Sequence, residues 1–582
     1  MFEPYLTTPL LLKAANTPHH IPKMSRICSD RPSTLVKYGN RVQPFPFPER
    51  QWPNKVLKTA PVLFSTDLRD GNQSLPNPMT FEQKLSLYKL LVSIGFKEIE
   101  VAYPCANQAE FDFVRHLIET PGLIPEDVLI QVITPCQEET IKRAVESVRG
   151  AKQAILFTYL PSSDNYRDTV LKISEDDWVE RARWGAAYAR SITKDSEDPV
   201  VRSTRWTFNF GFEDFANARI GAIIRCTEAV RAEWNPSKDE KMIIGVASSV
   251  EASTPNVFAD QIECLSGNIS NRDTVRLTVH THNDRGGAVA SAELASLAGA
   301  DRIEGCLFGN GERAGNMDLV VYALNLLTQG IEPGIDLSRL DEIRKVYEDI
   351  TELPVHPRTP YSGAYYLKAF SGAHQDAISK GLRLRTSATQ EGKPCAVWPA
   401  WRVPYLPLDP ADIGRSLDDV VGINSQSGKG GVAWVVNLGL GLDLPPGLAR
   451  TFSKAVKERS IHFGREMSSD EVCMAFLEEY QVLRAADKSD DDMIQAVLRT
   501  ESPLVAALGQ VVGLSSLSAS ITSHTLADDV LSYAAYANVT PEESKPSLWG
   551  VGLGVSLQQA KLRAVVSALQ VSDGSMSWVR LA

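Results

Sequence analysis

The sequence predicts an α/β protein whose largest part is a (β/α)8 TIM barrel, followed by helical linker subdomains and a smaller C-terminal α+β domain. Three observations predict this architecture. Short apolar runs alternate with amphipathic stretches about eight times between residues 57 and 335, as strands and helices do in such a barrel. Polar clusters follow several of these runs, where the carboxyl ends of the strands would lie. The chain has 582 residues, too many for one compact core.

Composition and charge narrow the class of protein. The hydrophobic share of 43% and the charged share of 23% are those of a globular protein. The net charge is −11 and no Lys/Arg-rich run occurs, so we expect no nucleic-acid partner. The eight cysteines form no CxxC pair, which favours a reducing compartment over a zinc ribbon or a disulfide framework. No apolar run reaches about 18 residues, so we expect no membrane span.

Residues 1–56 are predicted to form an N-terminal arm. The stretch "QPFPFPERQWPNK" is rich in proline and aromatic residues and is typical of an extended segment lying on another surface. The first 40 residues contain few acids, but "TTPLLLKAA" is too short and weak for a transit peptide. We therefore expect a cytoplasmic protein, with the mitochondrion as the alternative.

The alternation of strands and helices begins after the arm. "APVLFSTDLRD" predicts a buried strand that opens into a polar loop. A helix follows, because Thr80 has the character of an N-cap, Gln83 comes three residues later and Gly95 can end the helix. "FKEIEVAYP" predicts the second strand.

The same rhythm continues to about residue 335. Further strands are predicted in "VLIQVITP", "AILFTYLP", "TRWTFNF", "KMIIGVASSV", "VRLTVHTHND" and "ADRIEGCLFGNGE". From residue 336 the rhythm stops and an amphipathic helix, "SRLDEIRKVYEDITEL", opens linker subdomains that extend to residue 484. The acidic run "DKSDDD" precedes a smaller α+β unit, 485–582.

Two histidines in "HTHNDRGG" carry the first chemical signal. Residues i and i+2 of a strand point to the same side, so His280 and His282 would face one point. Asp70 and Asn316 lie in two other loops that follow predicted strands, and they add a carboxylate and an amide oxygen. A mixed set of nitrogen and oxygen ligands suits Zn²⁺, Mg²⁺ or Mn²⁺ with positions left for a chelating substrate.

Each of these residues also has a simpler interpretation when taken alone. Asp70 could form a turn before Gly71, and Asn316 could make a loop hydrogen bond. Arg69 could be an ordinary ion-pair partner, or it could stabilise negative charge beside a metal. Because all of them are expected at one end of one barrel, the set favours a metal site.

"GNGERA", residues 309–314, matches the dinucleotide-binding pattern G-x-G-x-x-G/A. Glu312 and Arg313 occupy positions where a close approach to a pyrophosphate requires small residues, and the motif comes late in the barrel. An NAD-dependent oxidoreductase is therefore not favoured.

Taken together, several clusters resemble 2-isopropylmalate synthases of the long, fungal-like type. They are "RQWPNK", "STDLRDGNQSLP", "HTHNDRG", "EGCLFGNGERAGN", "FSGAHQDAI", "VPYLPLDP" and "NSQSGKGG", and the likeness runs from about residue 45 to the C-terminus. The resemblance implies a Claisen condensation of acetyl-CoA with a 2-oxo acid, a divalent metal and K⁺ as an activator. It also implies a domain-swapped homodimer and a C-terminal domain of regulatory type, 485–582, that serves regulation or dimerisation.

The resemblance also assigns roles to individual residues. The family's metal ligands fall on the four positions named above. Its other functional positions, a metal-site arginine, two active-site glutamates, a substrate-binding threonine and a linker histidine and tyrosine, fall on Arg69, Glu213, Glu312, Thr254, His374 and Tyr405. The linker pair would reach the site from the partner subunit. His374, with Tyr405 or Glu213, is the expected base.

The chain departs from the family pattern where the 2-oxo acid should bind. The family's AIVHxYN reads "AILFTYL", with Phe157 and Leu160, and its FSPETF reads "FGFEDF", with Gly211 and Phe212. Its VGFPSAS reads "VAYPCAN", with Tyr103. Aromatic and apolar replacements in a pocket whose metal ligands are retained predict an altered substrate side chain, larger and aromatic as in an arylpyruvate. The alternative is drift within a leucine-pathway enzyme that acts on 2-oxoisovalerate.

Two further readings and one further departure stay open. A carbon–carbon lyase of the hydroxymethylglutaryl-CoA type would share the metal site without needing the linker motifs. A non-catalytic paralogue could keep the fold, although the retained ligands argue against it. The family's GVGxDxDI near the C-terminus reads "GVGLGVSL", with Gly554 and Ser556 at the acidic positions, which places leucine feedback in doubt.

Overall fold

The computed structural model describes residue 38 and residues 45–390, 401–480, 482, 517–527, 531–541 and 545–572. Most of the predicted N-terminal arm lies outside these residues. The segment 485–516, where the smaller C-terminal unit is predicted to begin, also lies outside them. Within the described ranges no helix is long and apolar enough to cross a lipid bilayer.

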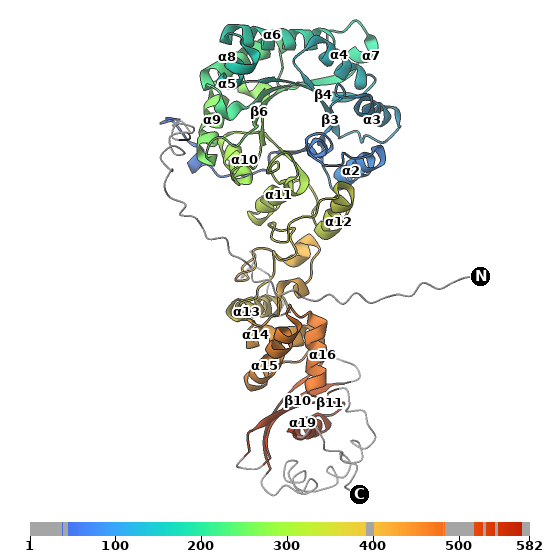
Figure 1. The fold of residues 1–582 in the computed structure, drawn as a ribbon, viewed down its shortest axis with the longest axis vertical. Coiled ribbons are helices and arrows are strands. Elements are labelled where there is room, and N and C mark those ends of the chain that lie inside the picture. Colours follow the sequence, from blue (N-terminus) through green and yellow to red (C-terminus); the bar gives the residue numbers. More distant parts are fainter. Residues whose placement is uncertain are drawn as a thin grey trace, which may run out of the picture.

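Eight parallel strands close into a barrel in the order of the sequence, which confirms the predicted fold class (Figure 1). Hydrogen bonding between the first and last strands completes the circle. The strands are β1 (Val62–Ser65), β2 (Glu98–Ala102), β3 (Leu129–Pro135), β4 (Gln153–Pro161), β5 (Arg205–Glu213), β6 (Met242–Ser248), β7 (Val275–Thr281) and β8 (Arg302–Gly305).

Helices surround the barrel and cover the outer faces of the strands. The first of them begins as predicted, because Thr80 and Gln83 form a reciprocal capping box at its N-terminus. The helices are α2 (Phe81–Ser93), α3 (Gln108–Glu119), α4 (Glu138–Ser147), α5 (Asp164–Tyr166), α6 (Glu175–Ser191), α7 (Pro199–Arg202), α8 (Ile220–Trp234), α9 (Pro255–Asn268), α10 (Ala288–Ala298) and α11 (Leu319–Thr328).

The interior of the barrel holds a charged network as well as apolar side chains. Arg302 is fully buried and forms ion pairs with Glu98 at 2.9 Å and with Glu304 at 2.7 Å. Its guanidinium also lies 4.0 Å from the centre of the Phe64 ring. Because a buried charge is costly unless it is paired, these partners make a cation in the core tolerable.

The residues just before the barrel lie on its outer wall. Trp52 is buried, and its Nε1 donates to the Asp260 carboxylate of α9 at 2.8 Å. Lys55 forms an ion pair with Glu263 of the same helix. The described end of the arm therefore rests on another surface, as the sequence predicts for it.

Five helices form the region after the barrel. They are α12 (Leu340–Thr351), α13 (Gly372–Gln390), α14 (Lys429–Leu440), α15 (Pro446–Phe463) and α16 (Ser469–Glu479). Arg415, in the segment between α13 and α14, ties that segment to α12. Its guanidinium contacts both carboxylate oxygens of Asp341, at 2.8 and 3.0 Å. Figure 1 shows α13 to α16 between the barrel and the C-terminal sheet.

The described part of the C-terminal unit is an antiparallel sheet with one helix packed on it. Its strands β9 (Ser518–Thr525), β10 (Tyr533–Thr540) and β11 (Leu548–Gly554) pair in the order β11-β10-β9, and α19 (Leu557–Ser572) crosses one face. Any side chain at Gly550 or Gly552 would overlap the backbone of α19. These two glycines therefore let helix and sheet approach closely.

Candidate metal centre and active site

A cavity of about 410 Å³ opens at the carboxyl ends of the barrel strands. This is the end at which barrel enzymes carry their active sites. The residues that line it include Arg69, Asp70, Tyr103, Phe157, Gly211, Glu213, Ser249, His280, His282, Glu312 and Arg313.

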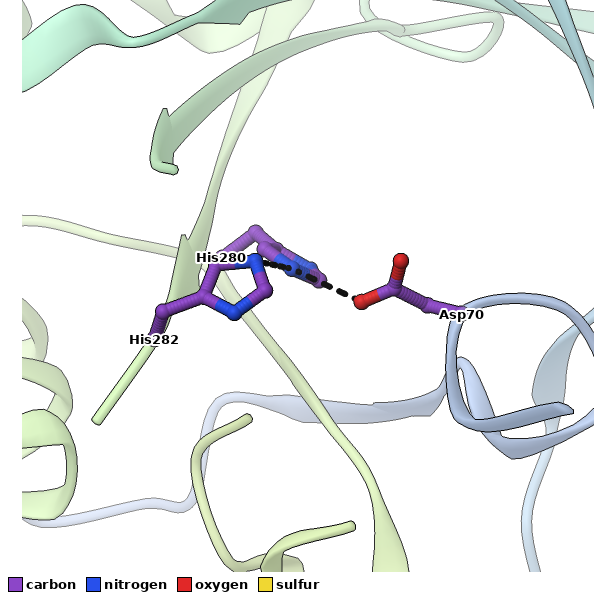
Figure 2. Close-up of side chains that lie close together, drawn as sticks. All are labelled: Asp70, His280 and His282. Atoms are coloured by element: carbon purple, nitrogen blue, oxygen red, sulfur yellow. Dashed lines mark hydrogen bonds and ion pairs between the residues drawn. The ribbon is translucent and has the colours of Figure 1, made fainter. Parts of the chain in front are cut away.

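Three predicted ligands meet at one side of this cavity (Figure 2). His280 and His282 both project from the end of β7 toward the same point, as strand alternation requires, and their Nε2 atoms are 3.2 Å apart. Asp70 faces them from the loop after β1, with its Oδ2 at 3.5 Å from the Nε2 of His280. The possible ligand atoms of the three residues lie within 4.8 Å of one another.

Asn316 completes the predicted set. Its Nδ2 donates to the Oδ2 of Asp70 at 2.7 Å. The Oδ1 of Asn316 and the Nδ1 of His282 are buried without a hydrogen-bond partner in the described structure. Because buried polar atoms are nearly always satisfied, these two orphaned atoms beside converging imidazole and carboxylate groups fit a divalent cation.

The protonation states also suit a cation site. Burial and the neighbouring His280 lower the pKa of His282 to about 3, so this ring is neutral and able to act as a ligand. Burial alone would raise the pKa of Asp70, but Arg69 and His280 hold it well below its usual range. Burial would lower the pKa of His280, but hydrogen bonds to Asp70 and Glu304 raise it to about 9. The cluster thus holds one extra proton, which a cation would replace.

Glu304 stands behind the first histidine. Its Oε2 lies 3.3 Å from the Nδ1 of His280, and its other oxygen accepts from Thr278 at 3.0 Å and from Arg302 at 2.7 Å. A carboxylate on the far nitrogen fixes the tautomer and orientation of a metal-binding histidine. The sequence analysis missed this residue, although it follows Arg302 by two positions on the same face of β8.

Arg69 lies in a tight π-helical turn, Asp67–Gly71, that follows β1. Asp67 anchors this turn by accepting from the backbone amide of Leu307 and from the Tyr347 hydroxyl, at 3.0 and 2.9 Å. The guanidinium of Arg69 pairs with Asp70 at 2.5 Å and also with the buried Glu100. The turn therefore presents a carboxylate and a fixed positive charge to the cavity together.

Two known family models match this chain, one over the barrel and one over part of the region that follows it. Residues 60–346 match the family model described as HMGL-like. Residues 365–437 match the one described as alpha-isopropylmalate synthase, post-catalytic domain-like.

Relatives match over nearly the whole chain. Isopropyl malate synthase gloH of Glarea lozoyensis is 49% identical, over 95% of this chain and 94% of its own length. Isopropyl malate synthase htyA of Aspergillus rugulosus is 51% identical, over 94% and 95%. The 2-isopropylmalate synthase of Schizosaccharomyces pombe is 43% identical, over 90% and 93%. The chain belongs to the isopropylmalate synthase family.

An isopropylmalate synthase is an acyltransferase, and members of the family use acetyl-CoA and a 2-oxo acid. The match to the post-catalytic domain favours this activity over the lyase alternative, which has no use for the linker motifs.

Both predicted active-site glutamates of this synthase line the cavity. Burial, with the nearby negative charge of Asp214, raises the pKa of Glu213. Glu312 accepts a hydrogen bond from the side-chain amide of Gln73 at 3.0 Å. A carboxyl group with a raised pKa next to a binding cavity is suited to proton transfer.

The wall away from the ligand cluster is aromatic. Tyr103, Phe157 and Tyr159 project from β4 and from the end of β2, and the rings of the last two lie 6.3 Å apart. Gly211 and Gly245 are neighbours in the pairing of β5 with β6, and both border the cavity. Any side chain at Gly211 would overlap the Phe157 ring.

Two residues that the sequence analysis assigned to the substrate site, Leu160 and Thr254, lie outside the cavity lining, and a third, Phe212, only borders the cavity. Leu160 is three residues from Phe157, so strand alternation turns it to the outer face of β4, where it is buried in the core. Phe212 borders the cavity, but its ring packs on Trp178 of α6, with ring centres 6.0 Å apart. Thr254 caps α9 outside the cavity lining, and Ser249 supplies the hydroxyl there instead.

The linker histidine and tyrosine meet each other but not this cavity. The rings of His374 and Tyr405 are stacked, with centres 4.0 Å apart and planes 17° apart. Both side chains are exposed, and Tyr405 retains 64% of its accessible surface. Figure 1 shows α13, which carries His374, well below the barrel.

Proposed function

We propose that the chain catalyses a metal-dependent Claisen condensation of acetyl-CoA with a 2-oxo acid that carries an aromatic side chain. The overall reaction joins the methyl carbon of acetyl-CoA to the keto carbon, consumes one water and yields a 2-substituted malate and free CoA. The observation that carries the proposal is one cavity that joins the ligand cluster to an aromatic wall.

The shape of that wall supports the aromatic substrate. Phe157 and Tyr159 offer aromatic surface to the cavity, and Gly211 on the neighbouring strand β5 makes room for the Phe157 ring. Aromatic rings pack well face to edge and in offset stacks when their centres are roughly 4.5–7 Å apart. A short branched side chain, as in 2-oxoisovalerate, would leave part of this wall without contact.

The ligand cluster supplies the place for the metal. Asp70, His280, His282 and Asn316 would hold Zn²⁺, Mg²⁺ or Mn²⁺, and Glu304 would orient His280. A divalent cation bound there would polarise the keto group of the substrate. K⁺ is an additional activator in this proposal.

The chain's own residues carry the remaining steps. Arg69 is placed to stabilise the negative charge that develops on the former keto oxygen. His374, with Tyr405 or Glu213, removes a proton from the methyl group of acetyl-CoA, and the resulting enolate attacks the keto carbon. Hydrolysis of the thioester then releases CoA. Glu213 and Glu312 border the space that both substrates must share.

We further infer a homodimer in which each barrel, residues 57–335, receives His374 and Tyr405 from the linker, 336–484, of its partner. The exposure of the stacked pair and its distance from the cavity of its own chain support this arrangement. The C-terminal unit, 485–582, would contribute to dimerisation.

Release of free thiol from acetyl-CoA tests the proposal against a panel of 2-oxo acids, with and without a chelator. We expect the highest kcat/KM with phenylpyruvate or 4-hydroxyphenylpyruvate and loss of activity with the chelator. Highest turnover with 2-oxoisovalerate would assign the chain to leucine biosynthesis. The aromatic wall would then reflect sequence drift and not a changed substrate. Activity that resists exhaustive chelation would contradict the metal site.

A further inference from the structure

Three loops at the carboxyl end of the barrel are tied together by one arginine. Arg313, in the loop after β8, donates its Nε to Asp284 in the loop after β7 at 2.6 Å, and a second nitrogen reaches the other oxygen of Asp284 at 3.2 Å. The same second nitrogen donates to the carbonyl oxygen of Ser249, in the loop after β6. One guanidinium thus fastens three successive loops.

The buried carboxylate of Glu251 also holds these loops together. Glu251 retains 4% of its accessible surface, and its Oε2 accepts from the backbone amides of Arg285 at 2.5 Å and Gly287 at 3.3 Å. The amide of Glu251 itself donates to Asp284 at 3.1 Å. A side chain at Gly287 would overlap the Glu251 carboxylate, so the loop can approach this closely only with glycine there.

The fastened loops are the ones that carry two of the proposed ligands. Asp284 lies two residues after His282, and Arg313 lies three residues before Asn316. The amide of Asn283 donates to the carbonyl of Gly315 at 2.9 Å, and His282 and Asn316 pair as an isolated β-bridge. Any shift of one loop against the other would therefore separate the two ligands.

Arg313 is held in an unfavourable backbone conformation. Its φ is 60°, in the left-handed region that is sterically unfavourable for a residue with a Cβ. Such conformations persist where surrounding contacts enforce them, and they concentrate at functional sites. The contacts to Asp284 and Ser249 are the ones that enforce it here.

We propose that Arg313, Asp284 and Glu251 form a positioning clamp that holds His282 and Asn316 in register for a metal and Ser249 in register for the 2-oxo acid. The inference rests on the proposed function, since it needs a metal at this cluster. None of the three residues is a ligand in this proposal; they act through the loops that they join.

The barrel offers a matched control at its other end. Arg272, before β7, donates to the carbonyls of Val275 and Gly299 and to the carboxylate of Asp301, at 2.6, 2.8 and 2.7 Å. Arg272 also donates to the Ser266 hydroxyl at 3.0 Å, so it forms an arginine junction of the same kind at the amino ends of β7 and β8. A change there disturbs the same pair of strands without touching the ligand loops.

The test titrates the metal-free full-length protein with Mn²⁺ by calorimetry. The variants are Arg313→Lys and Asp284→Asn, with Arg272→Lys as the control. We expect both clamp variants to lose 10- to 100-fold in Mn²⁺ affinity, as is typical when support behind metal ligands is removed. The two changes combined should weaken binding little more than either alone, because they break one junction. Arg272→Lys should lower only the melting temperature.

Steady-state kinetics adds a second readout. In Asp284→Asn, whose changed residue lies outside the cavity lining, the KM for the 2-oxo acid should rise several-fold while the KM for acetyl-CoA stays within twofold. If both clamp variants fold and bind Mn²⁺ as tightly as the wild-type protein does, the clamp is overturned and the proposed function is not affected. A wild-type protein that binds neither Mn²⁺ nor Zn²⁺ would overturn the proposed function and the clamp with it.

Discussion

The two ends of the barrel treat unfavourable backbone geometry differently. At the amino ends of the strands, the left-handed positions are occupied by residues that tolerate them: Gly95, Gly122, Gly150, Asn235, Asn271 and Gly299. At the carboxyl ends, the same region of φ also contains Phe308 and Arg313. Side chains with a larger steric cost are kept where the cavity and the ligand loops lie.

The hydrogen bonding of buried polar groups also differs between the two ends of the barrel. At the carboxyl end, the proposed ligands His282 and Asn316 each have a buried side-chain atom without a partner in the described structure. At the amino end, Arg272 and Asp301 satisfy each other and the neighbouring backbone. This difference agrees with the proposed metal site at the carboxyl end and with a purely structural role for the Arg272–Asp301 pair.

The sharpest test of this contrast exchanges one carboxylate at each end. Asp70→Asn should lower kcat/KM by on the order of 10³-fold, because a ligand and the charge partner of Arg69 are lost together. Asp301→Asn at the amino end should reduce thermal stability and leave kcat/KM within twofold. Thiol release and thermal melting of both variants measure this. Comparable losses of activity in the two variants would erase the functional distinction between the ends.

A smaller effect is expected behind the ligands. Glu304→Gln keeps the shape of the side chain but removes the charge that faces the Nδ1 of His280. Metal affinity should fall about 10- to 100-fold, because this contact orients the histidine. A competition titration against a chromophoric chelator gives the affinity directly. An unchanged value would show that the carboxylate serves the core ion pair with Arg302 and not the metal site.

The substrate wall should respond more modestly. Gly211→Ala places a methyl group where the Phe157 ring lies, so the ring must move into the cavity. Overpacking of this kind costs about 1–3 kcal/mol, and we expect roughly a tenfold lower kcat/KM with an arylpyruvate. The double variant Gly211→Ala/Phe157→Leu should recover part of that loss. No recovery would mean that the two positions act independently.

The smallest effect belongs to the amino end. Asn235 ends α8 with a φ of 52°, so Asn235→Ala should destabilise the protein by about 1 kcal/mol, whereas Asn235→Gly should be neutral or slightly stabilising. Neither substitution should change kcat or KM. Urea titration with activity assays on the same samples checks both statements. A kinetic effect of Asn235→Ala would show that strain at this end also reaches the active site.

Strand periodicity accounts for most of what the sequence predicted correctly. Spacing by two residues placed His280 and His282 together, and polar residues after apolar runs brought Asp70 and Asn316 to the same end. The same rule also contained the correction for Leu160, since a spacing of three from Phe157 reverses the face of the strand. Periodicity alone therefore predicts that Leu160 faces away from the cavity, and only the family pattern placed it in the substrate site.

Other features had no periodic signal. Ser249 and Thr254 lie in one irregular segment, where spacing does not say which hydroxyl faces the cavity. His374 and Tyr405 stack across a separation of 31 positions in the chain, and no local pattern predicts that contact. The clamp on Arg313 depends on three loops whose relative placement only the closed barrel determines.

The contact between Gly211 and the Phe157 ring also couples two positions on neighbouring strands. With any larger residue at position 211, the phenylalanine ring at position 157 could not take its observed place. Glycine at 211 combined with a smaller residue at 157 would instead leave an enlarged cavity. A search for variants that accept a wider range of substrates should therefore vary position 157 and keep Gly211.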